Sequence, residues 1–95
     1  MPESPSGQVI RKEMRVLTEY IRAAMHRAVY EILSDGTCYG EVPGFQGVYS
    51  NAASLEKCRS QLQEVLEGWI VLGWRLGHRL PIVDGVELTA GLEVA

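Results

Sequence analysis

Apolar side chains recur at intervals of three and four residues along two long stretches of the chain. This is the pattern of helices that bury one face. The first stretch spans residues 9–27. Its apolar positions are Ile10, Met14, Leu17, Ile21, Ala24, Met25 and Ala28. The opposite side carries Arg11, Arg15 and Arg22. We interpret it as a solvated face, because no second helix follows directly to complete a helix-turn-helix.

The second stretch begins after Ser54, whose side chain suits the N-cap position of a helix. Its apolar positions are Leu55, Cys58, Leu62, Val65, Leu66, Trp69 and Ile70. We expect this helix to run to about Leu76, with Gly77 as its left-handed terminator. Leu72 and Trp74 widen the apolar stripe beyond what one small sheet can cover. We therefore expect them to form contacts in a homo-oligomer, most simply one with two-fold symmetry.

Between the two predicted helices lies a predicted hairpin. Residues 28–33 and 37–42 flank Asp35-Gly36, a pair typical of a two-residue turn in which both residues have positive φ. In that register one face of the sheet carries Val29, Leu33, Cys38 and Val42, and the other carries Tyr30, Ile32 and Tyr39. Glu31 and Glu41 then fall on opposite faces. Because both faces are partly apolar, we expect the long helix to cover one face. The N-terminal helix or a second subunit would cover the other.

The stretch from Tyr39 to Ser54 connects the hairpin to the second helix. Pro43-Gly44 is a turn pair, and residues 47–50 predict a third strand. Residues 80–88 predict a last strand, or a pair of short ones around Asp84-Gly85. The element order predicts an α+β fold in which a small antiparallel sheet of three or four strands packs on one long helix. We assign residues 9–88 to a single domain, with a disordered tail at residues 1–8 and a second tail at residues 89–95.

The chain has 95 residues and a formal charge of −3, which is distributed unevenly. Residues 9–27 carry a local charge of +3, whereas residues 28–67 carry −4, from six acidic and two basic side chains. An acidic central part suits a basic partner, and the overall charge argues against a protein that coats nucleic acid. Cys38 and Cys58 lack the spacing of a metal site or a disulfide framework, so we expect both to be small buried hydrophobes.

No recognised catalytic pattern is present in the sequence. The two histidines, His26 and His78, lack a nucleophile with an orienting partner, and no carboxylate cluster suits metal ions. No glycine-rich phosphate loop precedes a helix. We therefore expect a protein that is not an enzyme and that holds no metal or cofactor. No signal peptide or membrane span is visible, which predicts a cytosolic protein that does not bind membranes.

The central residues resemble those of the HicB-type antitoxins. The resemblance is carried by Tyr39-Gly40-Glu41-Val42-Pro43, by Gly47-Val48-Tyr49, and by Ser54-Leu55-Glu56 at the start of the long helix. It covers about residues 28–88 and implies a partial RNase H-like βββαβ fold without the RNase H catalytic carboxylates. It also implies a binding function, in which the antitoxin docks on a small HicA-type RNA-cleaving toxin. We place the partner-binding residues at Tyr39, Glu41, Pro43 and Phe45, with Phe45 as the anchor.

Two features differ from the fuller family pattern. Many HicB-type proteins carry a C-terminal DNA-binding segment, and too few residues follow the long helix here to build one. We therefore expect a stand-alone form without direct DNA binding, with the N-terminal helix as an addition. Two alternatives to the antitoxin hypothesis are open. One is an oligomeric HicB-like domain that binds another protein or a small molecule. The other is a hydrolase of RNase H descent, against which the lack of converging carboxylates argues.

Overall fold

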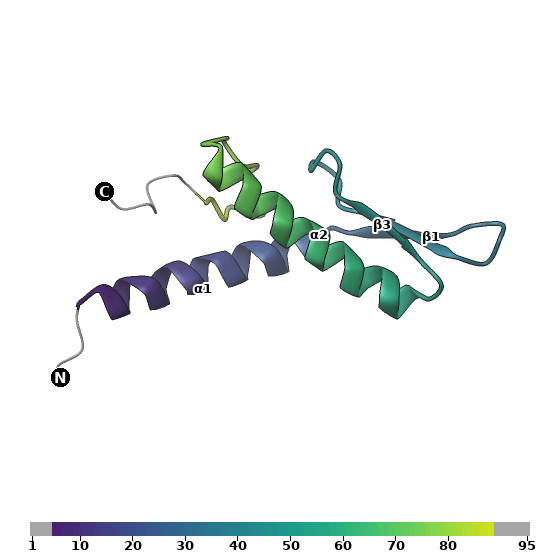
Figure 1. Ribbon diagram of the computed structural model, residues 1–95, viewed down its shortest axis with the longest axis horizontal. Helices are drawn as coiled ribbons and strands as arrows, with labels where there is room; N and C mark the ends of the chain where they lie inside the picture. Colours follow the sequence, from purple (N-terminus) through teal and green to yellow (C-terminus); the bar gives the residue numbers. More distant parts are fainter. Residues whose placement is uncertain (1–4, 89–95) are drawn as a thin grey trace.

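The computed structural model describes residues 5–88 of the chain, with side chains from Met14 onward (Figure 1). Two helices and three strands follow one another in the order α1 (Pro5–His26), β1 (Val29–Ile32), β2 (Cys38–Glu41), β3 (Tyr49–Ala52) and α2 (Leu55–Arg75). The strands form one antiparallel sheet in the order β1-β2-β3. The predicted tails at residues 1–4 and 89–95 lie outside the described residues.

Helix α1 begins at Pro5, so residues 5–8 are helical and not part of a disordered tail as predicted. Proline suits the first position of a helix, because its missing N–H would have no intrahelical partner there. The buried side of α1 largely follows the prediction, since Leu17, Ile21 and Met25 pack against the core, but it also includes Tyr20. Tyr20 and Ala24 are fully buried, whereas Met14 is 58% exposed. The sequence pattern missed Tyr20 because its hydroxyl group marks it as half polar.

The hairpin has a three-residue loop and not the two-residue turn that the sequence predicts. Ile32 pairs with Cys38, and the Gly36 N–H donates to the Leu33 carbonyl oxygen at 2.9 Å. Gly36 has φ +86, and Asp35 does not have a positive φ. This is the geometry of a turn followed by a glycine bulge. One additional loop residue shifts the pairing register, and a shift of one residue changes which side chains share a face.

The observed register corrects the predicted composition of both faces. Pairs such as Tyr30 with Gly40 and Gly40 with Ser50 lie on the face that α2 covers. Glu31 and Glu41, which the predicted register separates, share the opposite face, because their partners are Tyr39 and Val29. The same face carries Tyr49 and Asn51, which pair with Glu41 and Tyr39. Neither α1 nor any other described element covers this second face, which we call the open face (Figure 1).

Helix α2 matches its predicted bounds, because both of its ends are set by local signals. The Ser54 side chain accepts a hydrogen bond from the Lys57 N–H at 3.2 Å. At the other end Gly77 has φ +72 and donates to the Trp74 carbonyl oxygen, while the His78 N–H donates to that of Gly73. These two bonds make a Schellman cap. The buried residues of α2 are Cys58, Leu62, Leu66, Ile70 and Gly73.

Within residues 5–88, the segment after α2 does not add a fourth strand to the sheet, contrary to the prediction. Val83 and Val86 bond to each other across Asp84-Gly85, whose φ angles of 48° and 79° are both positive. This tight turn folds the segment back on itself. Its apolar side chains Leu80, Val83 and Leu88 are buried. They join the core, which leaves no free stretch to pair with a sheet edge. Arg27, directly after α1, and Asp84 form an exposed ion pair at 2.8 Å.

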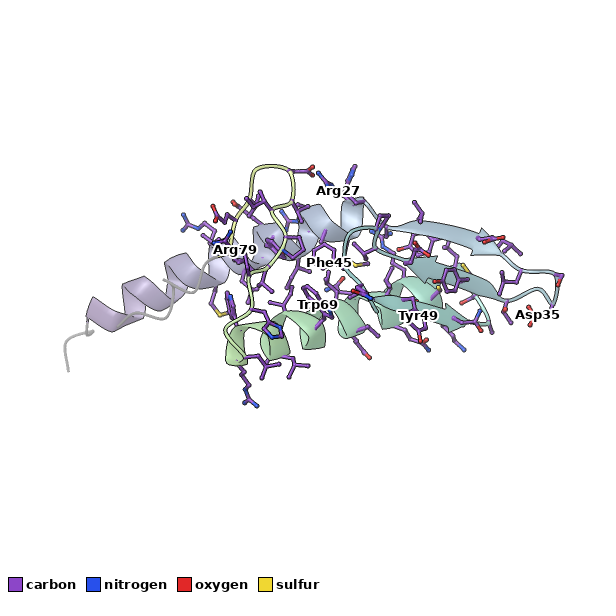
Figure 2. All side chains as sticks on the ribbon, turned by 90° about the horizontal axis from the view of Figure 1, so that it is seen from above. Arg27, Asp35, Phe45, Tyr49, Trp69 and Arg79 are labelled. Carbon is purple, nitrogen blue, oxygen red and sulfur yellow. The ribbon has the colours of Figure 1, made fainter. Side chains whose placement is uncertain are left out.

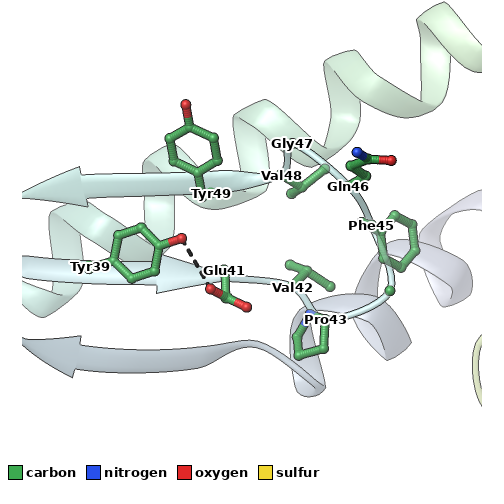
Figure 3. Close-up of a pocket in the computed structure, with 10 residues that line it drawn as sticks. Tyr39, Glu41, Val42, Pro43, Phe45, Gln46, Gly47, Val48 and Tyr49 are labelled. Atoms are coloured by element: carbon green, nitrogen blue, oxygen red, sulfur yellow. Dashed lines mark hydrogen bonds between the residues drawn. The ribbon is translucent and has the colours of Figure 1, made fainter.

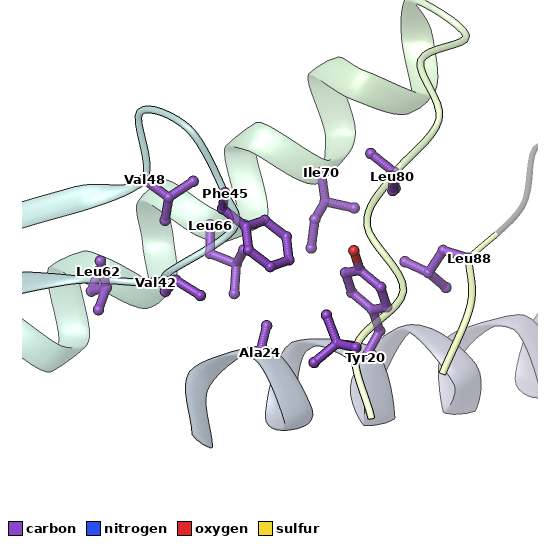
Figure 4. Packing of buried hydrophobic residues seen from close by; sticks show 11 residues of the cluster. Tyr20, Ala24, Val42, Phe45, Val48, Leu62, Leu66, Ile70, Leu80 and Leu88 are labelled. Carbon is purple, nitrogen blue, oxygen red and sulfur yellow. The ribbon is translucent and has the colours of Figure 1, made fainter. Parts of the chain in front are cut away.

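The main core lies beyond the end of the sheet, where both helices, the loop after β2 and the C-terminal segment meet (Figure 4). Its buried residues are Tyr20, Ala24, Val42, Phe45, Val48, Leu62, Leu66, Ile70, Leu80, Val83 and Leu88. A smaller cluster of Cys38, Ala52 and Cys58 joins the sheet to the first turns of α2. Both cysteines are free and buried, as predicted.

Candidate functional site: the open face of the sheet

The open face combines exposed aromatic and acidic side chains from all three strands. Tyr49 is 58% exposed and Val29 is 51% exposed. Glu31 and Asn51 are exposed, and Tyr39 and Glu41 are half-buried. These six residues, which alternate with the covered positions, include two glutamates and no lysine or arginine. The face is therefore acidic, and its large side chains contribute little to packing within the chain.

Tyr39 and Tyr49 form the centre of the open face (Figure 3). Their rings are stacked with centroids 6.2 Å apart and an interplanar angle of 28°. The Tyr39 hydroxyl donates a hydrogen bond of 3.0 Å to Oε1 of Glu41. This bond raises the pKa of Tyr39, and burial of the ring and the charge of Glu41 act in the same direction. The Tyr39 hydroxyl therefore holds its proton more strongly than a free tyrosine does, and it donates that proton to Glu41.

The loop after β2 forms one end of this face through two consecutive turns. The Phe45 N–H donates to the Val42 carbonyl oxygen, and the Val48 N–H donates to that of Phe45. The third residues of the two turns are glycines, Gly44 with φ +90 and Gly47 with φ +88. Positive φ at this position is the requirement of type II turns. The two turns border a shallow groove of about 400 Å³, which is lined by residues 41–49 and Tyr39.

Phe45 does not lie on the surface, which corrects its predicted role as the exposed anchor. Its side chain is 4% exposed and contacts Tyr20 and Trp69 edge-to-face, with centroids 6.1 and 5.1 Å away (Figures 2 and 4). The turn geometry directs Phe45 into the core, while Pro43 of the same loop is exposed. The sequence gives little indication that Phe45 is buried and Pro43 exposed. The direction of a loop side chain depends on the helices against which it packs.

The two residues predicted as oligomer contacts lie in different environments. Leu72 is 56% exposed on the outer side of α2. Trp74 is half-buried and packs against the main core. Trp69, expected in the middle of the buried stripe, is half-buried as well. Its Nε1 donates to the Gln46 carbonyl oxygen at 3.1 Å and so attaches the loop to α2.

Two kinds of site can be checked directly in the described residues. Among residues 14–88, no three His, Cys, Asp or Glu side chains gather as the ligands of a metal ion. In the described part of the chain, neither helix is both long and apolar enough to cross a membrane. Burial raises the pKa of the Cys38 thiol, and its hydrogen bond with Cys58 raises it further.

A three-stranded antiparallel sheet, covered on one face by a long helix and bare on an acidic aromatic face, defines a small α+β protein. The chain belongs to the UPF0150-like family, whose model matches residues 19–81. It is also similar to TTHA0281 from Thermus thermophilus, for which a crystal structure exists. The two sequences are 36% identical, and the TM-score is 0.73 over 77% of this chain and 91% of that chain. No curated protein matches the chain.

Proposed function

We propose that this protein is a non-catalytic binding module of the HicB type, which captures a small basic protein on the open face of its sheet. The observation that carries the proposal is the pair of stacked tyrosines flanked by Glu31 and Glu41 on an uncovered face. The family supports it, because UPF0150-like domains are commonly associated with HicB-like toxin–antitoxin proteins. A HicA-type RNA-cleaving toxin is the partner that this association favours.

The charge of the face favours a protein over a nucleic acid. Exposed tyrosines on a sheet can stack with bases, but RNA-binding sheets also supply basic side chains for the phosphates. Here the strand residues beside Tyr39 and Tyr49 are acidic or neutral. A guanidinium group from a partner could instead lie over a tyrosine ring and pair with the Glu41 carboxylate. Such a contact uses both features of the face together.

The acidic groups and the aromatic groups would have different parts in binding. The glutamates of this face would attract a basic partner over a distance and mainly increase the association rate. The tightness of the complex would come from burial of apolar area at Tyr49 and Val29, which are large and exposed. Pro43 and the shallow groove beside it extend this area at one end of the sheet.

Where a short basic reading frame adjoins the gene, co-expression of the two proteins tests the proposal. We expect the two proteins to co-purify, the protein to relieve any growth inhibition by its partner, and the complex to weaken as salt increases. Glu41→Lys should slow association, and Tyr49→Ala should speed dissociation. Glu56→Lys is the matched control, because it makes the same charge change on exposed α2.

Two results would contradict the proposal. One is the absence of a complex with the neighbouring protein. The other is a complex that Glu41→Lys and Tyr49→Ala leave unchanged while both variants are folded. Binding of single-stranded RNA by the same face, lost in Tyr49→Ala, would favour a nucleic-acid function instead.

A further inference from the structure

The side of α2 that faces away from the core carries a second exposed surface, separate from the open face of the sheet. A shallow groove of about 550 Å³ runs along it, lined by Glu64, Glu67, Gly68, Val71, Leu72 and Arg75. Val71 is 51% exposed and Leu72 is 56% exposed. Two large aliphatic side chains on the solvent side of a helix are not explained by packing within the chain.

Gly68 lies in the middle of this groove without a reason in the fold of one chain. A Cβ atom added at Gly68 would meet nothing within 4 Å. By contrast, one added at Gly73 would lie 2.8 Å from Leu80, so that glycine is needed for packing. A glycine inside a helix costs about 1 kcal/mol relative to alanine. Such a cost is explained where another backbone approaches the helix closely.

The spacing of the groove residues is that of a helix–helix seam. Glu64, Gly68, Val71 and Arg75 follow one another at steps of four, three and four, which places them in one line along the helix. The groove residues also form three pairs with a common midpoint between residues 69 and 70. These pairs are 64 with 75, 67 with 72, and 68 with 71.

The common midpoint of these pairs allows two copies of the helix to pack symmetrically. If two α2 helices cross antiparallel about a two-fold axis at the midpoint, each residue faces the other member of its pair. Glu64 then faces Arg75 of the second copy, twice, and Gly68 faces Val71. A parallel arrangement would place Glu64 against Glu64 and Arg75 against Arg75. The charges therefore favour the antiparallel arrangement and disfavour the parallel one.

We propose that this groove is a homodimer interface, in which the α2 helices of two copies cross antiparallel about a two-fold axis. Gly68 provides the close approach, Val71 and Leu72 provide the apolar area, and the Glu64–Arg75 pairs set the orientation. The contact is small, so the dimer forms at micromolar or higher concentration. The groove lies on the side of α2 remote from the sheet, so the two open faces point outward and the dimer presents two binding surfaces.

Charge exchange tests this interface. In a concentration series by sedimentation equilibrium, the wild-type mass should increase from 10.5 kDa toward twice that value. Glu64→Arg and Arg75→Glu should each remain monomeric, because like charges then face each other twice. The double variant E64R/R75E should dimerise again, because each pair is restored with its signs reversed. Glu56→Arg, outside the groove on the same helix, should dimerise like the wild type.

A variant at Gly68 separates dimerisation from folding. Gly68→Gln should fold with equal or higher thermal stability, since its side chain has open space and glutamine is a better helix former. It should nevertheless remain monomeric. Three results would overturn the proposal: a wild-type chain that stays at 10.5 kDa throughout, a Gly68→Gln variant that dimerises normally, or a folded double variant that does not recover.

The interface and the proposed function can fail independently of each other. Glu64→Arg should still bind the basic partner through the open face, with the stoichiometry of a monomer. Glu41→Lys, which lies on the sheet, should dimerise like the wild type and lose only partner binding.

Discussion

The two faces of the sheet are built from alternate residues of the same three strands, yet their side chains differ in size and polarity. On β2 and β3 the covered face carries small residues, namely Cys38, Gly40, Ser50 and Ala52, all of them buried. The open face carries Glu31, Tyr39, Glu41, Tyr49 and Asn51. The covered side chains of β2 and β3 are small because α2 and the Tyr30 ring of β1 pack directly against them.

The open face has no such constraint from within the chain. Its tyrosines are larger than a solvated strand requires, and they contact mainly each other and Glu41. Residues that are costly to expose and that do not pack in the core are the usual components of binding surfaces. The comparison thus separates residues that maintain the fold from residues that our proposal assigns to a partner. Substitutions on the covered side should lower the stability of the fold. Substitutions on the open face should weaken partner binding and change stability little.

The largest expected effect on stability is at Phe45. This residue is buried in the main core, next to the covered side of the sheet. Phe45→Ala should lower the free energy of unfolding by about 3–5 kcal/mol, because it leaves a cavity between Tyr20 and Trp69. Urea denaturation followed by tryptophan fluorescence would measure it. Gln46→Ala is the control in the same loop and should change stability by less than about 0.5 kcal/mol, since its side chain is exposed.

Gly40 tests how closely α2 approaches the covered face. A Cβ atom at this position would lie 2.8 Å from the Tyr30 ring and 3.1 Å from Sγ of Cys58. Gly40→Ala should therefore cost about 1–3 kcal/mol through overpacking. The loss should be smaller in a Tyr30→Leu background, which a double-mutant cycle would reveal. Equal losses in both backgrounds would show that the tyrosine ring is not the obstacle.

The sequence predicts α2 correctly at both ends because its signals are local. Ser54 and Gly77 act on backbone groups within a few residues, and the apolar period defines most of the buried face. The hairpin register is harder to predict, since both Asp-Gly pairs of the chain carry the same signal. Asp84-Gly85 adopts positive φ at both residues, whereas in Asp35-Gly36 only the glycine does. The loop length that decides between them depends on the whole sheet.

The candidate site is predicted only in part. Tyr39, Glu41 and Pro43 lie at or beside the open face, and their role in binding stays a prediction. Phe45 is buried because Tyr20 and Trp69 form a pocket for it, and both lie more than 20 residues away in sequence. Tyr49 and Glu31 join Tyr39 and Glu41 only in the observed register. A local sequence pattern does not predict a contact between segments that are far apart in the chain.

Substitution of Tyr20 should lower the free energy of unfolding by a smaller amount, and this amount should depend on pH. Its hydroxyl donates a hydrogen bond to the Pro81 carbonyl oxygen, and burial raises the pKa of Tyr20 to about 12. At neutral pH, Tyr20→Phe should cost about 1 kcal/mol through the lost hydrogen bond.

The pH dependence of this effect has a defined sign. Above pH 10 the unfolded chain loses the Tyr20 proton while the folded chain retains it, so wild-type stability falls as pH rises toward 12. The difference between the two proteins should therefore narrow above pH 10 and change sign before pH 12 in thermal melts, because the pKa shift is worth more than the hydrogen bond. A constant difference over that range would contradict the burial of this hydroxyl.

The smallest effect on stability should come from the open face itself. Tyr49→Ala removes one exposed ring of a cross-strand pair, which is worth about 0.2–1 kcal/mol. The same change should nevertheless abolish binding of the basic partner. Thermal melts together with calorimetric titration of the co-purifying protein would measure both. A melting temperature as low as that of Phe45→Ala would show that the face supports the fold.

The tip of the β1–β2 hairpin offers a practical site for engineering. Ser34, Asp35 and Gly36 are all exposed, and a Cβ atom at Gly36 would have no neighbour within 4 Å. This tip lies at the end of the molecule opposite α1 (Figure 1). The Asp35 carboxylate accepts bonds from the N–H and hydroxyl of Thr37, and the Gly36 N–H donates to the Leu33 carbonyl oxygen. A short tag inserted between Ser34 and Asp35 would keep the Asp35–Thr37 bonds and replace the Gly36–Leu33 turn, and it would label the protein without blocking α2.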